Sequence, residues 1–418
     1  MRVWILTVGE PLPVFDQNPR LFRTGLLARA LSARGHAVVW WTSTFDHYGK
    51  RHRSERDTLT RWDGGEIRLL RSTGYPTNRS LLRFVEHAGV ARKFGAVAPR
   101  LPRPDVILAS LPTIDLAHQA VRYARSTGVP IVVDVRDLWP DALLSLLPRL
   151  LRWPGRIVLS PLARKARITL RNTNAIVAVS PGYLEWGLRM ARRPRSSADQ
   201  VFPIGYVSTP EVANLGSAAR DGLIAKGVDE NKTICWYVGS FGRTCDLAPV
   251  ISAARALELM DSDGVQFVIS GDGELGPRWR DLARGLKNVV FTGWIGADEI
   301  EWLRRRASIG LQPYAAGAPQ GLANKLFEYL SAGLPVVSSL LGENEALLRK
   351  HECGLTYPPG DSRACLEKVS ELLDNPSGRV AMGLRARAAF EESFDGEKVL
   401  ERFSAYLEAL AATAVHLA

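Results

Sequence analysis

Residues 319–337 hold the most informative group of polar side chains in the chain. The segment reads Pro-Gln-Gly-Leu-Ala-Asn-Lys-Leu-Phe-Glu-Tyr-Leu-Ser-Ala-Gly-Leu-Pro-Val-Val, and its glycine-containing loop precedes a predicted helix over 325–332. Lys325 and Glu328 are three residues apart and therefore share one face of that helix. A cation at a helix N-terminus opposes the macrodipole unless an anion joins them. Glu328, one turn later, can accept hydrogen bonds from paired hydroxyls such as a ribose diol; a salt bridge on a solvated helix is the competing interpretation.

Glycine-rich turns follow three apolar segments upstream of this helix. They are Gly239-Ser240-Phe241-Gly242, which is followed by Arg243, then Gly271–Glu274, then Gly293–Gly296. Glycines let a backbone approach a phosphate, and a following helix N-terminus presents free N–H groups. The carboxyl ends of parallel strands face one crevice, so the three turns together predict a nucleotide site. A tight turn without a ligand is the competing interpretation of any one of them.

The elements that must position these residues are read from short, continuous apolar runs. Such runs predict strands covered on both faces, as in a parallel sheet flanked by helices. Amphipathic segments between them predict helices, and the rhythm runs twice, so we expect an α/β protein with two Rossmann-like, doubly wound domains. The predicted strands cover 3–8, 37–42, 105–109, 130–135, 175–179, 233–238, 265–270, 288–292, 307–313 and 335–338. The predicted helices cover 20–34, 116–127, 247–260, 298–306 and 325–332.

The length of the chain and the distribution of its charged residues predict two domains of opposite net charge. It has 418 residues, of which 46% are apolar, which excludes wholesale disorder. The first 200 residues carry 32 Lys and Arg against 15 Asp and Glu, whereas the remainder is net acidic. The basic half predicts an anionic partner: a phosphorylated substrate, a nucleic acid or an anionic membrane. We expect an N-terminal domain over 1–205, a second domain over 206–394 and a terminal helix over 395–418.

The segment 319–337 resembles the nucleotide-sugar signature of retaining GT-B glycosyltransferases, specifically glycosyltransferase family 4. That signature is a Glu, seven residues, a second Glu, a short helix and an A-G-x-P turn. Glu328 stands at the second Glu and Ala332-Gly333-Leu334-Pro335 forms the turn, whereas Gln320 replaces the first Glu. Glutamine keeps hydrogen bonds to the donor sugar but loses the charge, which leaves the identity of that sugar open. The resemblance is strongest over 233–340 and implies two domains that face a central cleft.

The resemblance also implies roles for single residues. Arg243 and Lys325 match the basic pair that holds the donor diphosphate and stabilises it as it leaves, and Glu328 matches the ribose-binding carboxylate. It implies that the terminal helix packs back on the N-terminal domain. The remaining donor-binding positions implied are Gly9, Gly239, Trp294, Gln320, Gly321, Leu322 and Asn324.

Two positions of the first domain depart from the family pattern. Ser110 stands where many members have a histidine, and Arg136-Asp137 precedes a Trp-Pro pair where the family has His-Asp. Arg136 and Asp137 are therefore candidate acceptor-binding residues. Arg136 could bind an anionic acceptor group, or it could pair with Asp137 or Asp141, and both interpretations stay open. His118 lies inside a predicted helix and is interpreted as structural.

We expect neither a metal nor another cofactor. Asp46, His47 and His52 have irregular loop spacing for a metal site, so a polar acceptor-binding loop or a solvated loop is favoured. Asp261-Ser262-Asp263 resembles the D-x-D metal motif of the other glycosyltransferase fold, but it joins a helix to a strand away from the glycine turns and predicts a turn. The basic pair would neutralise the diphosphate without a metal.

A cytoplasmic protein is expected, either soluble or peripheral on the inner face of a membrane. The apolar run 3–8 is too short for a secretory signal, no run reaches the ~18 residues of a spanning helix, and four cysteines without C-x-x-C spacing fit a reducing compartment. The segment 144–170 mixes basic residues with Leu and Trp. It is either an interfacial helix on an anionic leaflet or an ordinary amphipathic core helix with a solvent-exposed basic side. The net positive charge of the first half of the chain favours the interfacial helix.

The function predicted is retaining transfer of a sugar from a nucleoside-diphosphate sugar, most often a UDP-sugar in this family. The acceptor would be a sugar or a lipid-linked glycan, in synthesis of an envelope polysaccharide or lipid-linked glycan. A UDP-sugar epimerase on the same architecture is the first alternative, although no spare pair of carboxylates is evident. A non-catalytic nucleic-acid binder is the second, but no helix-turn-helix or aromatic RNA-binding motif is visible, and no nucleic-acid partner is expected.

Overall fold

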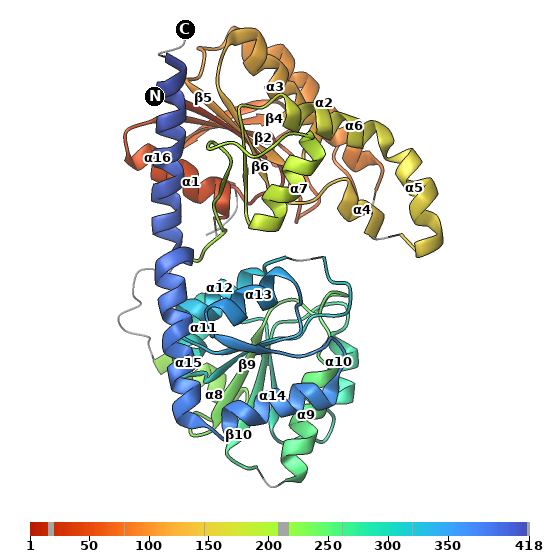
Figure 1. Cartoon of the computed structure of the whole chain (residues 1–418), viewed down its shortest axis with the longest axis vertical. Helices are drawn as coiled ribbons and strands as arrows, with labels where there is room; N and C mark the ends of the chain where they lie inside the picture. Colours follow the sequence, from red (N-terminus) through yellow and green to blue (C-terminus); the bar gives the residue numbers. More distant parts are fainter. Residues whose placement is uncertain are drawn as a thin grey trace. The chain divides into compact units, whose positions relative to one another are not determined.

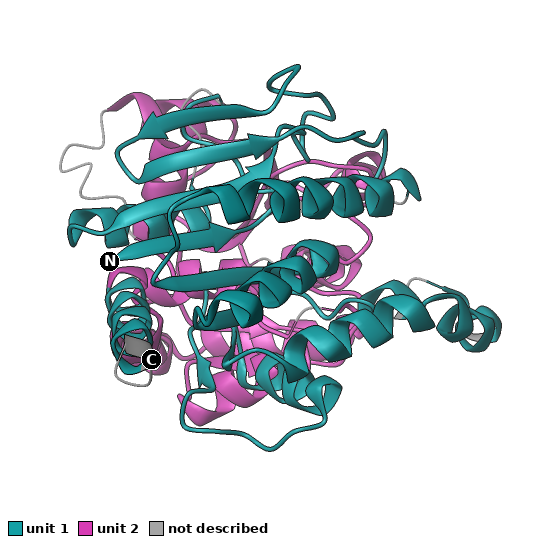
Figure 2. Ribbon diagram, turned by 90° about the horizontal axis from the view of Figure 1, so that it is seen from above, with its two compact units in different colours: residues 1–204, 398–418 teal, residues 205–397 magenta. Residues whose placement is uncertain are grey.

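Two units, each with its own sheet and core, make up the chain. Unit 1 comprises residues 1–204 and 398–418, and unit 2 comprises residues 205–397 (Figures 1 and 2). The computed structural model describes residues 1–15, 21–78, 80–145, 147–207, 217–260, 262–319 and 321–415. Gln320 and Asp261 therefore lie outside the described residues.

Unit 1 is built on an eight-stranded sheet in the order β3-β4-β2-β1-β5-β6-β7-β8. All neighbouring strands pair in parallel except β3 and β4. The strands are β1 (Arg2–Leu6), β2 (Ala37–Ser43), β3 (Thr58–Trp62), β4 (Gly65–Leu70), β5 (Val106–Leu111), β6 (Ile131–Val135), β7 (Ala175–Ala178) and β8 (Gln200–Val201).

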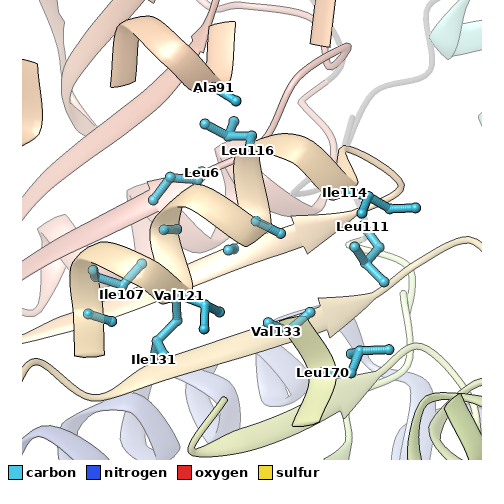
Figure 3. Close-up of a cluster of buried hydrophobic side chains, with 14 of the residues drawn as sticks. Leu6, Ala91, Ile107, Leu111, Ile114, Leu116, Val121, Ile131, Val133 and Leu170 are labelled. Carbon is cyan, nitrogen blue, oxygen red and sulfur yellow. The ribbon is translucent and has the colours of Figure 1, made fainter. Parts of the chain in front are cut away.

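The core of unit 1 lies on both faces of this sheet, which confirms the reading of its continuous apolar runs. Trp4 and Leu6 of β1 belong to one buried cluster, whereas Val3 and Ile5 belong to another, because successive side chains of a strand point to opposite faces. Figure 3 shows α3 lying over β5 and β6 in the first cluster. The helices are α1 (Arg23–Ala33), α2 (Leu82–Val97), α3 (Ile114–Thr127), α4 (Asp141–Ser145), α5 (Arg152–Val158), α6 (Ser160–Arg171), α7 (Pro181–Ala191) and α16 (Gly396–Val415).

The β3–β4 hairpin is an element that the apolar runs did not reveal. Alternate residues of β3 are exposed, so the strand lacks the continuous apolarity of its neighbours. Its signal is the Asp63-Gly64 pair between Trp62 and Gly65, the residue types that favour a two-residue hairpin turn.

Unit 2 carries a six-stranded, wholly parallel sheet in the order β11-β10-β9-β12-β13-β14. Its strands are β9 (Thr233–Val238), β10 (Val265–Ser270), β11 (Val289–Gly293), β12 (Ile309–Gln312), β13 (Val336–Ser338) and β14 (Gly354–Thr356). Its helices are α8 (Ser217–Ala225), α9 (Ala248–Leu259), α10 (Gly276–Leu282), α11 (Ala297–Arg306), α12 (Asn324–Ser331), α13 (Glu343–Lys350), α14 (Ser362–Leu373) and α15 (Pro376–Ala389).

The terminal helix α16 contributes to the core of unit 1. Val399, Phe403 and Leu407 are buried in the same cluster as β1. The rings of Phe403 and Phe202 are stacked, with centroids 4.3 Å apart. Across the described ranges, no helix combines the length and the apolarity needed to cross a bilayer.

Candidate functional site

The glycine turns of unit 2 lie against one another at the carboxyl edge of its sheet. The Gly239 N–H donates to Ser270 O (3.0 Å), and the Gly271 N–H donates to Gly293 O (2.8 Å). A Cβ on Gly271 would lie 2.0 Å from Gly239 O, and the φ of Gly271 is +126°. Only glycine permits that approach. The loops after β9, β10 and β11, which begin at Gly239, Gly271 and Gly293, are therefore in backbone contact with one another, and we call them the glycine platform.

The side chain of Lys325 lies against the Gly239 loop of the glycine platform. It occupies the first turn of α12, and its Nζ is 4.1 Å from the ring centroid of Tyr237 and 5.3 Å from that of Tyr314. A Cβ on Gly239 would lie 2.9 Å from Nζ. Burial lowers the pKa of Lys325 to about 8, although Cys245 and Glu328 act to raise it. The ammonium therefore still carries its charge at pH 7 and faces the backbone of the glycine loop.

Glu328 lies one turn further along α12 and is buried. The adjacent Tyr329 fixes this helix in place: its hydroxyl accepts from Val238 N–H (3.1 Å) and donates to Leu311 O (3.1 Å). The Tyr329 ring covers Gly310, where a Cβ would lie 2.6 Å from Cγ. Tyr329 is thus a positioning residue for Lys325 and Glu328. Sequence reasoning did not single it out, because it reads as one more apolar position of the helix.

Arg243, the other half of the predicted basic pair, contacts an acidic residue. Its Nη2 lies 2.7 Å from Oε1 of Glu274, and the hydrogen bond to Glu274 raises the pKa of Arg243. Both side chains are exposed, and exposed ion pairs contribute little to stability. An anionic ligand can therefore compete with Glu274 for this guanidinium at small energetic cost.

The remaining predicted donor residues differ in their surroundings. Trp294 follows β11 and is 68% exposed, so its indole is available to a ligand. Gly321 and Leu322 are half-buried and Asn324 is exposed at the start of α12, whereas Gln320 lies outside the described residues.

In unit 1, Arg136 belongs to a buried ionic network at the carboxyl edge of the sheet, and Gly9 lies next to a member of it. Gly9 has a φ of +93° and precedes Glu10, which pairs with Arg136. Arg136 Nε also donates to Asp134 Oδ2 (2.8 Å). Among the described residues, the ion pairs of Arg136 are with Glu10 and Asp134 rather than with Asp137 or Asp141, a pairing that neither open interpretation contained.

Arg23 completes this network. Its Nε donates to Asp134 Oδ2 (2.9 Å), and its Nη1 donates to the carbonyl oxygens of Phe202 (2.8 Å) and Pro203 (3.0 Å). Burial acts to raise the pKa of Asp134, but Arg23 and Arg136 outweigh it and hold that pKa below its ordinary value. Glu10 and Arg23 lie more than a hundred residues before Asp134 and Arg136, and no spacing rule links the two pairs, so sequence reasoning missed the network.

A second group in unit 1 surrounds Asp137. Burial raises the pKa of Asp137, against the influence of Arg83. The Arg83 guanidinium lies 4.5 Å from the ring centroid of Trp139 and 5.9 Å from that of Tyr75. The Tyr75 hydroxyl is 2.6 Å from His47 Nδ1, and burial lowers the pKa of His47 to about 4. The Arg83 guanidinium and the rings of Trp139 and Tyr75 thus lie near the half-buried carboxyl of Asp137.

The histidines considered as metal ligands have separate partners. His47 contacts Tyr75, His52 Nδ1 lies 2.9 Å from Thr44 Oγ1, and Asp46 pairs with Arg53. Within the described part of the chain, no group of three or more His, Cys, Asp or Glu is arranged to hold a metal ion. His118 lies in α3, where its Nδ1 is 3.1 Å from Thr169 Oγ1.

Comparisons with known proteins agree with this architecture. The family model "Glycosyl transferase 4-like domain" matches residues 22–198, and "Glycosyl transferases group 1" matches residues 232–375. WcaI of Escherichia coli K12, whose name assigns it to colanic acid biosynthesis as a glycosyl transferase, is 24% identical over 404 residues, covering 91% of this chain and 94% of WcaI.

Solved structures share the fold across almost the whole chain. The sucrose-phosphate synthase of Thermosynechococcus elongatus has a TM-score of 0.72 at 17% identity and covers 99% of both chains. HepE of Anabaena in complex with UDP-glucose has a TM-score of 0.63 at 14% identity, covering 98% of this chain and 100% of HepE. At this identity the likeness shows the fold alone.

Proposed function

We propose, from the premise that this chain belongs to the GT-B glycosyltransferases, that it moves a sugar from a nucleoside-diphosphate sugar to an acceptor hydroxyl. The observation that carries the proposal is the Lys325 ammonium set against the Gly239 loop at the strand ends of unit 2. A UDP-sugar epimerase is not favoured, because both family models and WcaI are glycosyl transferases.

Unit 2 binds the donor in this proposal. Lys325 and Arg243 hold the diphosphate over the Gly239 loop, and Glu328 accepts from the ribose hydroxyls. The segment containing Gln320, Gly321, Leu322 and Asn324 contacts the donor sugar and phosphates, and Trp294 lies beside the base. A UDP-sugar is the preferred donor, since HepE, of the same fold, is solved with UDP-glucose.

The proposed reaction retains the anomeric configuration and uses electrostatic stabilisation. Negative charge grows on the leaving diphosphate as the glycosidic bond breaks, and preorganised cations lower the energy of that state. Two cations, Lys325 and Arg243, supply this charge, so we expect transfer without a metal. The departing diphosphate would accept the proton of the incoming hydroxyl on the same face of the sugar.

Unit 1 binds the acceptor in this proposal. Asp137 and Arg83 lie beside the aromatic rings of Trp139 and Tyr75, a combination suited to sugar hydroxyls and an anionic substituent. Arg136 would act there mainly by holding Glu10 in place. Because WcaI is named for colanic acid biosynthesis, the acceptor class proposed is an envelope polysaccharide or lipid-linked glycan, at the cytoplasmic face of the membrane.

Nucleotide-dependent thermal unfolding tests the donor assignment. The wild-type chain in EDTA should be stabilised by a few degrees by UDP at ~100 times its Kd, more than by GDP, ADP or TDP. Lys325→Ala should lose the shift, whereas Lys350→Ala, which changes an exposed lysine of α13, should keep it. A folded wild-type chain that shifts with none of the four nucleotides would contradict the proposal.

The affinity for UDP should depend on pH through Lys325. Its pKa of about 8 means that the ammonium is charged below pH 8 and neutral above it, while the terminal phosphate of UDP stays fully ionised above roughly pH 7. We expect the Kd for UDP to be flat from pH 7 to 8 and to rise by up to about tenfold per pH unit above that. Isothermal titration over this range measures the profile, and Lys325→Arg should flatten it. An unchanged Kd up to pH 9.5 would argue against a Lys325–phosphate contact.

A further inference from the structure

The stretch 142–184 of unit 1 is strongly cationic. It contains seven Lys and Arg residues and no Asp or Glu. Its part before β7, together with Asp141, forms α4, the short helix Arg149–Leu151, α5 and α6, and Figure 1 shows α5 projecting away from the sheet of unit 1. We call residues 141–171 the arm.

The tip of the arm, residues 150–158, is largely apolar, and no element of the described part of the chain covers it. No residue of α5 is buried, and Leu150, Trp153 and Val158 are 91%, 70% and 76% exposed. The base of the arm is different, because Leu170 of α6 lies in the core of unit 1 (Figure 3). The interpretation of the segment as an ordinary core helix therefore holds for the end of α6 and is wrong for α5.

A basic groove runs behind the tip. It has a volume of about 860 Å³ and is lined by residues that include Arg156, Arg164 and Arg167. Nε of Arg167 is buried and has no hydrogen-bond partner among the described residues. Asp141 is the acidic residue of the groove lining, and its carboxylate accepts from Trp186 Nε1 (2.8 Å); Lys165 of the lining pairs with Asp115. The groove thus offers cations to an external anion.

We propose that the arm docks on an anionic phospholipid bilayer, with α5 inserted at the interface and the groove cations meeting lipid phosphates. An exposed apolar helix beside seven basic residues and a single acidic residue, Asp141, is the combination that binds an anionic leaflet. The proposal rests on the proposed function, because docking would hold the enzyme beside a membrane-linked acceptor. A bilayer fits the arm better than a protein partner does, because an anionic leaflet offers hydrocarbon and phosphate groups side by side. The exposed apolar side chains of α5 and the groove cations lie side by side in the same way.

Vesicle sedimentation in the absence of donor tests this proposal. The full chain should bind phosphatidylglycerol/phosphatidylcholine vesicles, bind pure phosphatidylcholine much less, and be released by high salt as surface charges are screened. The tip variant Trp153→Ser/Ile157→Ser/Val158→Ser should bind at least ~10-fold more weakly. The groove variant Arg164→Gln/Arg167→Gln should bind several-fold more weakly. The matched control Leu259→Ser/Val380→Ser/Leu384→Ser removes three exposed apolar residues of unit 2 and should bind like the wild type.

Several results would overturn the proposal. They are equal binding to both kinds of vesicle, a tip variant that binds as well as the wild type, and a tip variant that changes only the oligomeric state in light scattering. Because α5 has no buried residue, the tip variant should stay folded and keep its thermal shift with UDP. A chain that binds anionic vesicles but shifts with no nucleotide would support docking and reject the donor assignment, so the two failures are distinguishable.

Discussion

Replacing Lys325 with alanine is expected to lower turnover by roughly a hundredfold or more. The Lys325 ammonium lies against the Gly239 loop and between the rings of Tyr237 and Tyr314. A cation held in such partly desolvated surroundings stabilises charge on a leaving diphosphate without having to reorganise. Removing one preorganised group of this kind typically costs ~3 kcal/mol of transition-state stabilisation.

The measurement is UDP release from whichever UDP-sugar the wild-type chain turns over fastest. Lys325→Arg should recover part of the rate, because it keeps the charge but not the compact ammonium. Lys350→Ala is the control for loss of a lysine elsewhere in unit 2. Near-normal turnover of Lys325→Ala would remove Lys325 from the catalytic machinery and with it the main support for the donor site.

Replacing Asp134 with alanine is expected to destabilise unit 1 by about 3–5 kcal/mol. The Asp134 carboxylate is fully buried and accepts from both Arg23 (2.9 Å) and Arg136 (2.8 Å). Without it, two buried guanidiniums would share Glu10 as their remaining carboxylate in the network. Arg23 also holds the carbonyls of Phe202 and Pro203, so the loss would reach the segment that leads out of unit 1.

Asp63→Ala provides the matched control for this experiment. Asp63 Oδ2 lies 3.0 Å from Arg29 Nε, the same pair of groups in the same unit, but both side chains are exposed, and such pairs contribute ~0–1 kcal/mol. Urea unfolding followed by tryptophan fluorescence would compare the variants, with each unit allowed its own transition. Equal losses in the free energy of unfolding for Asp134→Ala and Asp63→Ala would show that the buried network stabilises unit 1 no more than an exposed ion pair does.

The same network predicts the direction of the pH effect. The pKa of Asp134 is lowered in the folded chain, so its contribution to stability is fully present above the pKa that Asp134 has in the unfolded chain and is lost as the pH falls through its lower folded-state pKa. Asp199, whose carboxylate accepts from Arg193 and Ser196, behaves in the same direction, with its pKa lowered to about 2.

The sequence by itself determined the repeated parallel sheets and the place of the donor-site candidates. Continuous apolar runs identify strands buried on both faces, and a glycine turn after a strand lies at the carboxyl edge whatever the rest of the fold does. Lys325 and Glu328 could be selected because they lie within one helical turn. Gly239 could be selected because it lies in a short glycine loop directly after a strand.

Only the tertiary structure decided which distant groups meet. Glu10, Arg23, Asp134 and Arg136 form one network because α1, β1 and β6 meet at the same place, and no short-range pattern encodes that meeting. The two interpretations of 144–170 likewise share one sequence. They differ in whether another element covers α5, and burial depends on the packing of the whole unit rather than on the residues of the helix alone.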